Sequence, residues 1–516
     1  MAFLELIPGA IGTKQIVFIV LLGLILSFVV RRVYSVYFGP LSKFPGPKLA
    51  AATLWYEFYY DVILQGHYTF KIKELHEKYG PIIRISPNEL HIDEPDYYEK
   101  LYSQHEPRDK SEYYLSQFKL PGSSFGTADY RHHRIRRGAL NPFLSKQAIV
   151  RVEPMLNYMI DKLCNRINEF QKSGQPMPIR LVYSCLATDI VTLIVLNHNR
   201  NLLDTPDFSP VWIETVKAIA AAGHIMKQFP WLFDIIRVLP PSFVGAMNPG
   251  MRLLLDGQAL TQQETRNVLE GKYKADKQYE TLGLEKTIFH EILESDIPEE
   301  EKSFERLWQE AQVTIGAGSD TTGNAFTVTH FHLLDNPDIL KKLQTELREA
   351  LPNKYDTIEL RVVEQLPYLN AVLNEGLRFS YGISTRSPRI HPTETVKFHQ
   401  YEIPAGTPVG MTSVHIHHNE TIFPESNKFK PERWLQKQPK GAPLLDRYLV
   451  SFSKGSRQCV GMQLAKAELQ LGIATVFRRY ENQELFETTR ADVDIKHDLF
   501  LPAADLKSKG VRVIFK

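Results

Sequence analysis

The sequence of 516 residues has few cysteines and no excess of either charge. Its three cysteines, Cys164, Cys185 and Cys459, are too few and too widely separated for a disulfide framework, so we expect a reducing compartment. The 61 Lys and Arg residues nearly balance the 59 Asp and Glu residues, which leaves a formal net charge of +2. No overall field therefore draws the chain to nucleic acid, and we expect no nucleic-acid partner.

Long apolar runs are also missing, with one exception near the N-terminus. Hydrophobic residues make up 43% and charged residues 23% of the chain, which is typical of a folded globular protein. The exception is residues 16–30, which carry no charge and are followed directly by Arg31 and Arg32. With its flanks this run is long enough to cross a bilayer, with the arginine pair on the cytoplasmic side. A signal peptide is the alternative, but no small-residue cleavage site follows.

The chain is expected to divide into four segments. These are a short lumenal N-terminus over 1–12, a transmembrane anchor over 13–33, a linker with a Pro-Gly-Pro hinge over 34–48, and one catalytic unit over 49–516.

Periodicity in the catalytic unit predicts a mainly α fold with a small β region. The helical pattern prevails from about residue 150 to 350, and the proline-free stretch 304–334 predicts a helix that crosses the molecule. Short alternating stretches, such as 82–85 and 91–92, predict strands.

A motif near the C-terminus combines five specified positions within ten residues: Phe452, Gly455, Arg457, Cys459 and Gly461. A helix predicted to start just after Cys459 would stabilise a thiolate there through its positive end. The glycines would permit a tight turn and the close approach of a flat macrocycle, and Arg457 could meet an anionic group on it. A lone cysteine is more often buried and inert, but this combination is rare by chance and favours a metal-binding thiolate.

The motif resembles the haem-binding signature of the cytochromes P450. The resemblance implies the cytochrome P450 fold, preceded by one N-terminal transmembrane helix, with haem b as the cofactor and Cys459 as its axial ligand. It also implies that Phe452, Arg457 and Gly461 surround the haem. Haem propionates would be contacted by His133, Arg137 and Arg389, although His133 stands where the family more commonly has Trp.

Two further elements in the expected order support this resemblance. Glu375, Arg378 and Arg433 match the family's ion network behind the haem, and we expect this network to fix geometry more than to add stability. Residues 317–322, AGSDTT, resemble its oxygen-binding pattern. There Gly318 would leave room for dioxygen and substrate, while Asp320 and Thr321 would deliver protons. Gly316 and Gly318 do not make a dinucleotide loop, because the third glycine is missing.

The family resemblance implies a monooxygenase that uses O2 and electrons from NADPH. No flavin or nicotinamide fingerprint occurs, so the electron donor is expected to be a separate NADPH–cytochrome P450 reductase at the endoplasmic reticulum membrane, with the single-pass chain's catalytic domain in the cytosol. Residues 108–114, 133–143 and 227–233 resemble the fungal trichodiene-oxygenase-like branch, which implies an apolar secondary metabolite such as a terpenoid or meroterpenoid. The expected pocket residues are Phe118, Ile315, Ala317, Ile383 and Phe500.

Other functions remain open from the sequence alone. They are a haem-thiolate isomerase or dehydratase without external electrons, a fatty-acid or sterol hydroxylase, and a non-catalytic haem- or ligand-binding protein; Asp320 and Thr321 favour the monooxygenase. His415, His417 and His418, expected on a strand or loop, lack the spacing of a zinc site. The sequon at Asn419 is expected to be unmodified in the cytosol.

Overall fold

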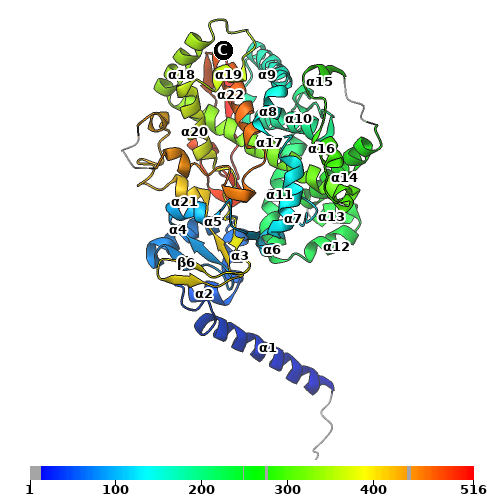
Figure 1. The fold of residues 1–516 in the computed structure, drawn as a ribbon, viewed down its shortest axis with the longest axis vertical. Coiled ribbons are helices and arrows are strands. Elements are labelled where there is room, and N and C mark those ends of the chain that lie inside the picture. The colour runs from blue at the N-terminus through cyan, green and yellow to red at the C-terminus, as the bar shows by residue number, and fades with distance from the viewer. Residues whose placement is uncertain (1–12, 248, 273–276, 438–442) are drawn as a thin grey trace, which may run out of the picture.

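The computed structural model describes residues 13–247, 249–272, 277–437 and 443–516. A large helical body lies beside a smaller region that holds most of the strands, and the N-terminal helix projects from the latter (Figure 1). The mainly α fold with a small β region, expected from the sequence, is confirmed.

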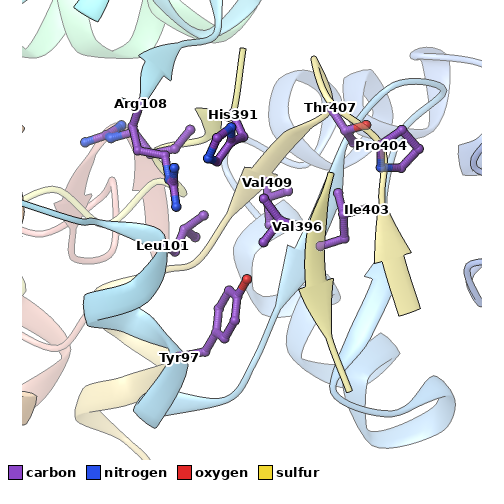
Figure 2. A pocket seen from close by; sticks show the side chains of 10 residues that line it. Tyr97, Leu101, Arg108, His391, Val396, Ile403, Pro404, Thr407 and Val409 are labelled. Atoms are coloured by element: carbon purple, nitrogen blue, oxygen red, sulfur yellow. The ribbon is translucent and has the colours of Figure 1, made fainter. Parts of the chain in front are cut away.

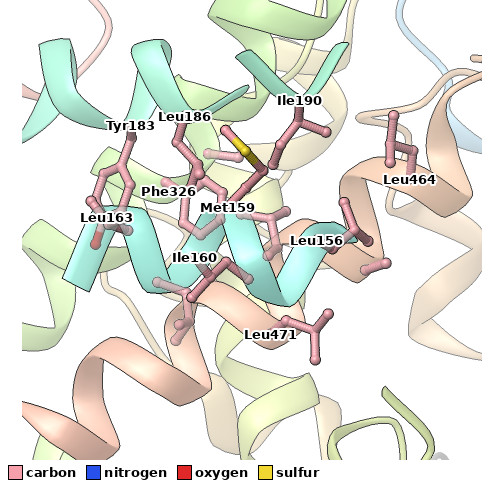
Figure 3. Close-up of a cluster of buried hydrophobic side chains, with 14 of the residues drawn as sticks. Leu156, Met159, Ile160, Leu163, Tyr183, Leu186, Ile190, Phe326, Leu464 and Leu471 are labelled. Atoms are coloured by element: carbon pink, nitrogen blue, oxygen red, sulfur yellow. The ribbon is translucent and has the colours of Figure 1, made fainter. Parts of the chain in front are cut away.

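The centre of the body is the long helix α17, Phe304–Asp335. It packs against α10 (Ile179–Leu196), α20 (Pro367–Ser380) and α22 (Met462–Arg479). Together with α9 (Glu153–Ser173) these helices enclose the main hydrophobic core, part of which Figure 3 shows. Burial of each large apolar side chain stabilises the fold by about 1.5–3 kcal/mol.

One contact shows how closely these helices approach. Tyr183 of α10 stacks on Phe326 of α17, with ring centroids 4.7 Å apart and an interplanar angle of 12°. The stretch from 304 to 334 is therefore a core-crossing helix, as its lack of proline predicts.

The remaining α-helices cover this core and the β-rich region. They are α2 Lys48–Ala52, α3 Trp55–Phe58, α4 Tyr68–Tyr79, α5 Tyr98–Leu101, α6 Glu112–Leu115, α7 Tyr130–Leu140, α8 Lys146–Arg151, α11 Pro210–Gln228, α12 Leu232–Val238, α13 Pro241–Met247, α14 Pro249–Leu269, α15 Lys277–Thr281, α16 Ile288–Glu294, α18 Pro337–Ala350, α19 Leu360–Val363 and α21 Ser413–His417.

Single turns of other helical types connect these elements. They are the π-helical η1 Tyr59–Ile63 and the 3-10 turns η2 Pro95–Tyr97, η3 Leu202–Asp204, η4 Glu299–Lys302, η5 Pro431–Trp434, η6 Leu445–Tyr448, η7 Gly455–Arg457 and η8 Arg490–Asp492.

The largest sheet has five strands in the order β1-β2-β8-β5-β3. Their bounds are β1 Ile82–Arg84, β2 Leu90–Ile92, β3 Asp109–Lys110, β5 Arg389–Ile390 and β8 Pro408–Gly410. The pairs are antiparallel except β2 with β8. The alternating stretches near residues 82 and 91 thus form the predicted strands.

Three smaller sheets complete the fold. The strands β4 Met177–Pro178, β9 Gln483–Leu485 and β12 Arg512–Phe515 form one of them. The hairpins β6 Val396–Phe398 with β7 Tyr401–Ile403, and β10 His497–Leu499 with β11 Leu501–Ala503, form the other two.

The N-terminal helix α1, Thr13–Tyr37, runs four residues past the expected end of the anchor at Val33. Its segment Lys14–Tyr37 has a mean hydropathy of 2.5, and its most apolar stretch is wholly exposed. The other helix of similar length and hydropathy, α10, is mostly buried in the core. Helix α1 is therefore apolar and long enough to cross a membrane.

The end of α1 is tied to the β-rich region. Arg84 donates hydrogen bonds to the backbone oxygen and the hydroxyl of Ser35, both at 2.9 Å. Phe44, in the expected hinge, is buried and stacks on Tyr401 with centroids 5.3 Å apart. The segment expected as a hinge thus packs against the body.

Candidate active site

The cysteine motif forms a tight loop between η7 and α22. The Cys459 amide donates to the Phe452 carbonyl at 2.9 Å, which closes the loop. Gly455 has φ +74°, and a Cβ there would lie 2.1 Å from the Tyr102 carbonyl oxygen. Only glycine fits both requirements. Helix α22 then begins at Met462, three residues after the thiol, as predicted.

The Cys459 side chain is accessible to solvent. It is exposed by surface area, yet burial among the surrounding residues raises the pKa of its thiol. A Gly461 backbone hydrogen bond and the positive charge of Arg137 act in the opposite direction and lower that pKa. The Cys459 thiol is thus accessible although many residues surround it. Cys164 and Cys185 are instead buried, and burial raises the pKa of both thiols.

Four cations and a histidine lie together, and one of the cations, Arg137, is close enough to Cys459 to affect its pKa. Lys110 on β3 lies directly opposite Arg389 on β5 in an antiparallel pair. Burial first, and then Arg389, Arg457 and Arg137, lower the pKa of the Lys110 ammonium. Burial and the same cations lower the pKa of His133 to about 2, so its ring is neutral at pH 7.

The charge of this cationic cluster (Lys110, His133, Arg137, Arg389 and Arg457) is poorly compensated. Burial and Arg389 lower the pKa of Arg457 to about 9 although Asp109 and Asp129 act in the opposite direction, and its buried Nε has no hydrogen-bond partner. Its other nitrogens donate only to backbone oxygens, those of Thr127, Ala128 and Asp129, at 2.6–3.1 Å. Buried like charges are stabilised by an anion, and the two propionates of a haem supply two carboxylates.

The residues present therefore fit a haem. The accessible thiol and the cationic cluster are the two features that a porphyrin with an axial thiolate and two acidic arms requires. The structure brings the predicted His133, Arg137, Arg389, Arg457 and Cys459 into this one region.

A small cavity lies behind the cationic cluster, on the side of the β-rich region. It has a volume of about 20 Å³ and is lined by Tyr97, Arg108, Arg389 and His391, among others (Figure 2). One water molecule fits in that space. Arg389 thus borders both this cavity and the cationic cluster.

The three residues expected to form an ion network do lie together. Glu375 and Arg378 make two hydrogen bonds, of 2.8 and 3.0 Å, and neither side chain is exposed. Glu375 also accepts hydrogen bonds from Arg433 at 3.2 Å and from the Trp434 indole at 2.9 Å. Arg378 also donates to the carbonyl of His417 at 2.7 Å. Such a buried network fixes geometry, because each member left alone would be an uncompensated charge.

On α17, the two residues expected to deliver protons have different surroundings. Thr321 is half-buried, and its hydroxyl donates to the Ala317 carbonyl at 2.7 Å. Ala317 is exposed, so this face of an otherwise buried helix borders open space. Asp320 is buried and accepts a hydrogen bond from Arg180 of α10 at 2.7 Å. The acid and the hydroxyl therefore point to different neighbours.

Gly318 has a packing role that the sequence did not predict. A Cβ at this position would lie 2.9 Å from Cγ2 of Val191 on α10. The missing side chain therefore permits the close packing of α10 on α17, and the small residue that borders the open space is Ala317. The expectation that Gly318 makes room for dioxygen and substrate stays a prediction.

Aromatic rings form one part of the expected pocket wall. The rings of Phe118 and Phe500 are 4.7 Å apart in an edge-on arrangement, and Phe125 lies about equally far from both, at 6.0 and 6.1 Å. Ile383 is half-buried, but Ile315 is 1% exposed and belongs to the main core. Ile315 is therefore a core residue, contrary to the expectation that it lines the pocket.

Sequence reasoning missed two residues of the site. Lys110 lies in a stretch that carries no haem motif, and only the pairing of β3 with β5 places it beside Arg389. Arg180 is 140 residues before its partner Asp320, and nothing in the local pattern joins them. Both depend on long-range packing, which a single sequence does not reveal.

The histidine-rich stretch is a structural element. His415 and His417 are buried in the helix α21, contrary to the expected strand or loop. His417 donates to the Arg378 carbonyl and accepts from the Val450 amide. Across the described ranges, no three His, Cys, Asp or Glu side chains are grouped so as to hold a metal ion. The Asn419 side chain accepts from the backbone amides of Thr421 and Ile422.

Comparison with known proteins agrees with this geometry. The family model described as cytochrome P450 matches residues 45–509. A cytochrome P450 monooxygenase of Ascocoryne sarcoides is 50% identical over 493 residues, which cover 94% of this chain and 95% of that protein. A tryptophan 6-hydroxylase of Fusarium equiseti is 40% identical, with 96% of each chain covered. An N-acetyltryptophan 6-hydroxylase of Emericella nidulans is 38% identical, with 95% and 96% covered.

These relatives are fungal monooxygenases, and their similarity extends over nearly the whole chain. The narrower trichodiene-oxygenase-like branch stays a prediction. The family itself is shown by the matched model and by the identity of the relatives: the chain is a cytochrome P450 monooxygenase.

Proposed function

We propose that this monooxygenase binds haem b through the Cys459 thiolate and oxidises an apolar secondary metabolite with O2. The observation that carries the proposal is the cationic cluster, in which Lys110, Arg389 and Arg457 are buried without an ion pair to any carboxylate of the described residues, next to an accessible thiol. Bound there, a haem-thiolate supplies oxygen activation, with the thiolate favouring O–O cleavage.

The protein's own residues have three tasks in this proposal. Arg137, Arg389, Arg457 and Lys110 bind the propionates, and neutral His133 can donate one N–H to them. The Gly461 amide and the start of α22 stabilise the thiolate. Asp320 and Thr321 hold and move protons on the substrate side, where Asp320 is oriented by Arg180.

The test of the haem site is the absorbance of the reduced, carbon monoxide-treated full-length protein in detergent. Thiolate ligation gives a Soret band distinct from that of an imidazole-ligated haem, whereas Cys459→Ala is expected to retain no haem. Cys164→Ala is the matched control, because it removes a thiol buried in the core. A colourless wild-type protein after haem supplementation, or a spectrum of imidazole ligation, contradicts the proposal.

Turnover separates the monooxygenase from its alternatives. We propose that electrons come from a membrane-bound NADPH–cytochrome P450 reductase, so oxidation should require that protein and NADPH. Product formation without either would indicate an isomerase or dehydratase. Haem binding without any product would indicate a carrier.

For the substrate we propose a terpenoid or meroterpenoid, because the wall formed by Phe118, Phe125 and Phe500 is apolar. A second candidate is an indole derivative, since aromatic rings pack edge-on against such a wall and two relatives are named as hydroxylases of tryptophan and N-acetyltryptophan. Type I difference spectra with a sesquiterpene hydrocarbon and with N-acetyltryptophan decide between them. A sterol or a fatty acid that alone gives the shift would contradict both.

We also propose that α1 anchors the protein in the endoplasmic reticulum membrane, with the catalytic domain in the cytosol. The exposed apolar helix and the arginines at 31 and 32 support this orientation. Protease treatment of intact microsomes should digest the catalytic domain. Protection of that domain would reverse the orientation, and an N-terminus cleaved near residue 33 would indicate a signal sequence.

A further inference from the structure

Phe500 is a large aromatic residue in a backbone conformation that such residues rarely adopt. It lies at the tip of the β10–β11 hairpin, between the paired residues Leu499 and Leu501, with φ +74°. Side chains other than glycine are strained in this left-handed region. Such a conformation persists only where neighbouring groups hold it in place.

The side chain of Asp498 holds Phe500 in this conformation through hydrogen bonds. Its Oδ1 accepts hydrogen bonds from the Phe500 amide at 3.2 Å, the Ser384 hydroxyl at 2.7 Å and the Thr385 hydroxyl at 2.5 Å. Its Oδ2 accepts from the Thr69 hydroxyl. The residue is 2% exposed, so water cannot readily replace these donors.

Asp498 thereby joins two pieces of the pocket wall. One is the hairpin tip with Phe500, and the other is the segment that follows Ile383. The Ser384 amide also donates to the Phe500 carbonyl at 3.2 Å, and the Ile383 carbonyl accepts from the Ser413 hydroxyl at 2.9 Å. The two pieces are therefore fixed relative to each other by one carboxylate and one backbone bond.

We propose that Asp498 is a positioning residue of the substrate pocket. It holds the Phe500 ring edge-on to Phe118, 4.7 Å away, and so determines which bulky ligands fit against this wall. This inference rests on the proposed haem site only for its first readout. Asp498 acts through Phe500 and does not itself touch the ligand.

The backbone of Asp498 is held independently of its side chain. Its amide donates to the Gly66 carbonyl at 2.8 Å, and its carbonyl accepts from His224 Nε2 at 2.6 Å. A side-chain variant should therefore leave strand β10 in place. Asp498→Asn keeps an acceptor for the three donors and can donate to Thr69, whereas Asp498→Ala removes all of these bonds.

The first test compares two haem ligands on the full-length holoprotein. The affinity of imidazole depends on the haem iron alone. The affinity of 4-phenylimidazole depends also on the contact of its phenyl ring with the wall formed by Phe118, Phe125 and Phe500. We expect Phe500→Ala and Asp498→Ala each to weaken 4-phenylimidazole binding roughly three- to tenfold, the size of one aromatic contact, and to leave imidazole binding within about twofold. The double variant should be no weaker than either single one, and Asp498→Asn should restore most of the affinity.

Two outcomes would overturn this role. One is an Asp498→Ala protein that binds 4-phenylimidazole like the wild type while Phe500→Ala does not. The other is an additive double variant, which would mean that Asp498 acts independently of Phe500. Asp492→Ala is the matched control, because Asp492 also accepts from a hydroxyl and an amide, those of Ser508 and Thr489, outside this wall.

Hydrogen exchange gives a readout that needs no haem ligand. In Asp498→Ala the Phe500 amide loses its acceptor, and we expect the peptide over residues 497–503 to exchange about tenfold faster, with wild-type rates in Asp498→Asn. Unchanged exchange contradicts the inference. A wild-type protein without any imidazole shift would instead contradict the haem site, while the exchange result would still decide the role of Asp498.

Discussion

Arg180 and Asp320 form an ion pair between α10 and α17, with 2.7 Å between Nη2 and Oδ1. Arg180 also donates to Asn324, one turn further along α17. Asp320 is buried, whereas Thr321, the next residue, is half-buried on the face that includes exposed Ala317. The pair fixes the orientation of an acid next to Thr321, in the region proposed to bind oxygen. It thereby links the expected proton-delivery residues to a second helix.

Replacement of Asp320 should slow oxidation without affecting haem binding. We expect Asp320→Asn to lower the rate about 100-fold, the typical contribution of a positioned proton donor, with an unchanged carbon monoxide spectrum. Arg180→Lys should retain most of the rate because it keeps the cation, and Arg180→Gln should not. Stopped-flow measurements in H2O and D2O would test this, since the solvent isotope effect should rise in Asp320→Asn. An unchanged rate in that variant would exclude Asp320 from proton delivery.

Loss of the Thr321 hydroxyl should uncouple NADPH consumption from product formation. We expect Thr321→Ala to keep haem and to consume NADPH, with the yield of oxidised product per NADPH about tenfold lower and hydrogen peroxide in its place. Thr321→Ser should restore the yield. Thr327→Ala is the matched control. Thr327 lies further along α17, and its hydroxyl likewise donates to the carbonyl four residues earlier, that of Gly323, at 2.6 Å. Unlike Thr321, however, Thr327 is buried. Unchanged coupling in Thr321→Ala would show that another group delivers the proton.

Local pattern was enough to predict the elements that carry the chemistry. The loop around Cys459 and the long helix over 304–335 follow from short-range spacing and proline placement. The contacts of Asp320 were not predictable, because Arg180 reaches it only through helix packing. The reason for Gly318 was missed in the same way, since the direction of its absent Cβ depends on where α10 lies.

Removal of one cation from the cationic cluster should have opposite effects on the haem-free and the haem-loaded protein. Lys110 lies opposite Arg389, so Lys110→Met relieves a like-charge pair and should stabilise the haem-free chain by about 0.5–1 kcal/mol. The loaded protein loses a charge-assisted bond and should release haem about tenfold faster. Urea unfolding and haem transfer to an acceptor protein measure the two effects.

The control for Lys110 is a buried cation that has its own acid. Arg136 pairs with Glu301 at 2.6 Å, so Arg136→Met leaves this carboxylate with only His132 and the more distant Arg306, and should destabilise the chain in both states. If Lys110→Met also destabilises the haem-free chain, the hydrogen bond from Lys110 Nζ to the Phe125 carbonyl outweighs the repulsion from Arg389.

The Glu375 network should be necessary for folding. Glu375→Gln leaves Arg378 and Arg433 as buried charges without an anion, and we expect a loss of about 3–5 kcal/mol in the free energy of unfolding. Glu432→Gln is the control from the neighbouring turn, because Glu432 pairs with exposed Lys342 and should cost no more than about 1 kcal/mol. Equal effects of the two variants would contradict the special role of the buried acid.

Acid should destabilise the protein through histidines that are buried in the neutral form. Burial, with smaller contributions from Arg490 and Arg378, lowers the pKa of His332 from 6.5 to about 3. The unfolded chain therefore binds a proton at this residue between about pH 6.5 and 3 while the folded chain does not, so stability falls as the pH drops through that range. At pH 5 the loss from His332 alone is about 2 kcal/mol.

His332→Phe should remove this part of the acid sensitivity. The ring stacks on Phe429 at 4.8 Å, with an angle of 10°, and its Nε2 has no hydrogen-bond partner, so phenylalanine can take its place. Urea unfolding at pH 7.5 and pH 5.0 should show a difference about 2 kcal/mol smaller in the variant than in the wild type. Exposed His105 serves as the control, since His105→Gln should leave that difference unchanged. The same loss in His332→Phe as in the wild type would mean that other groups cause the acid sensitivity.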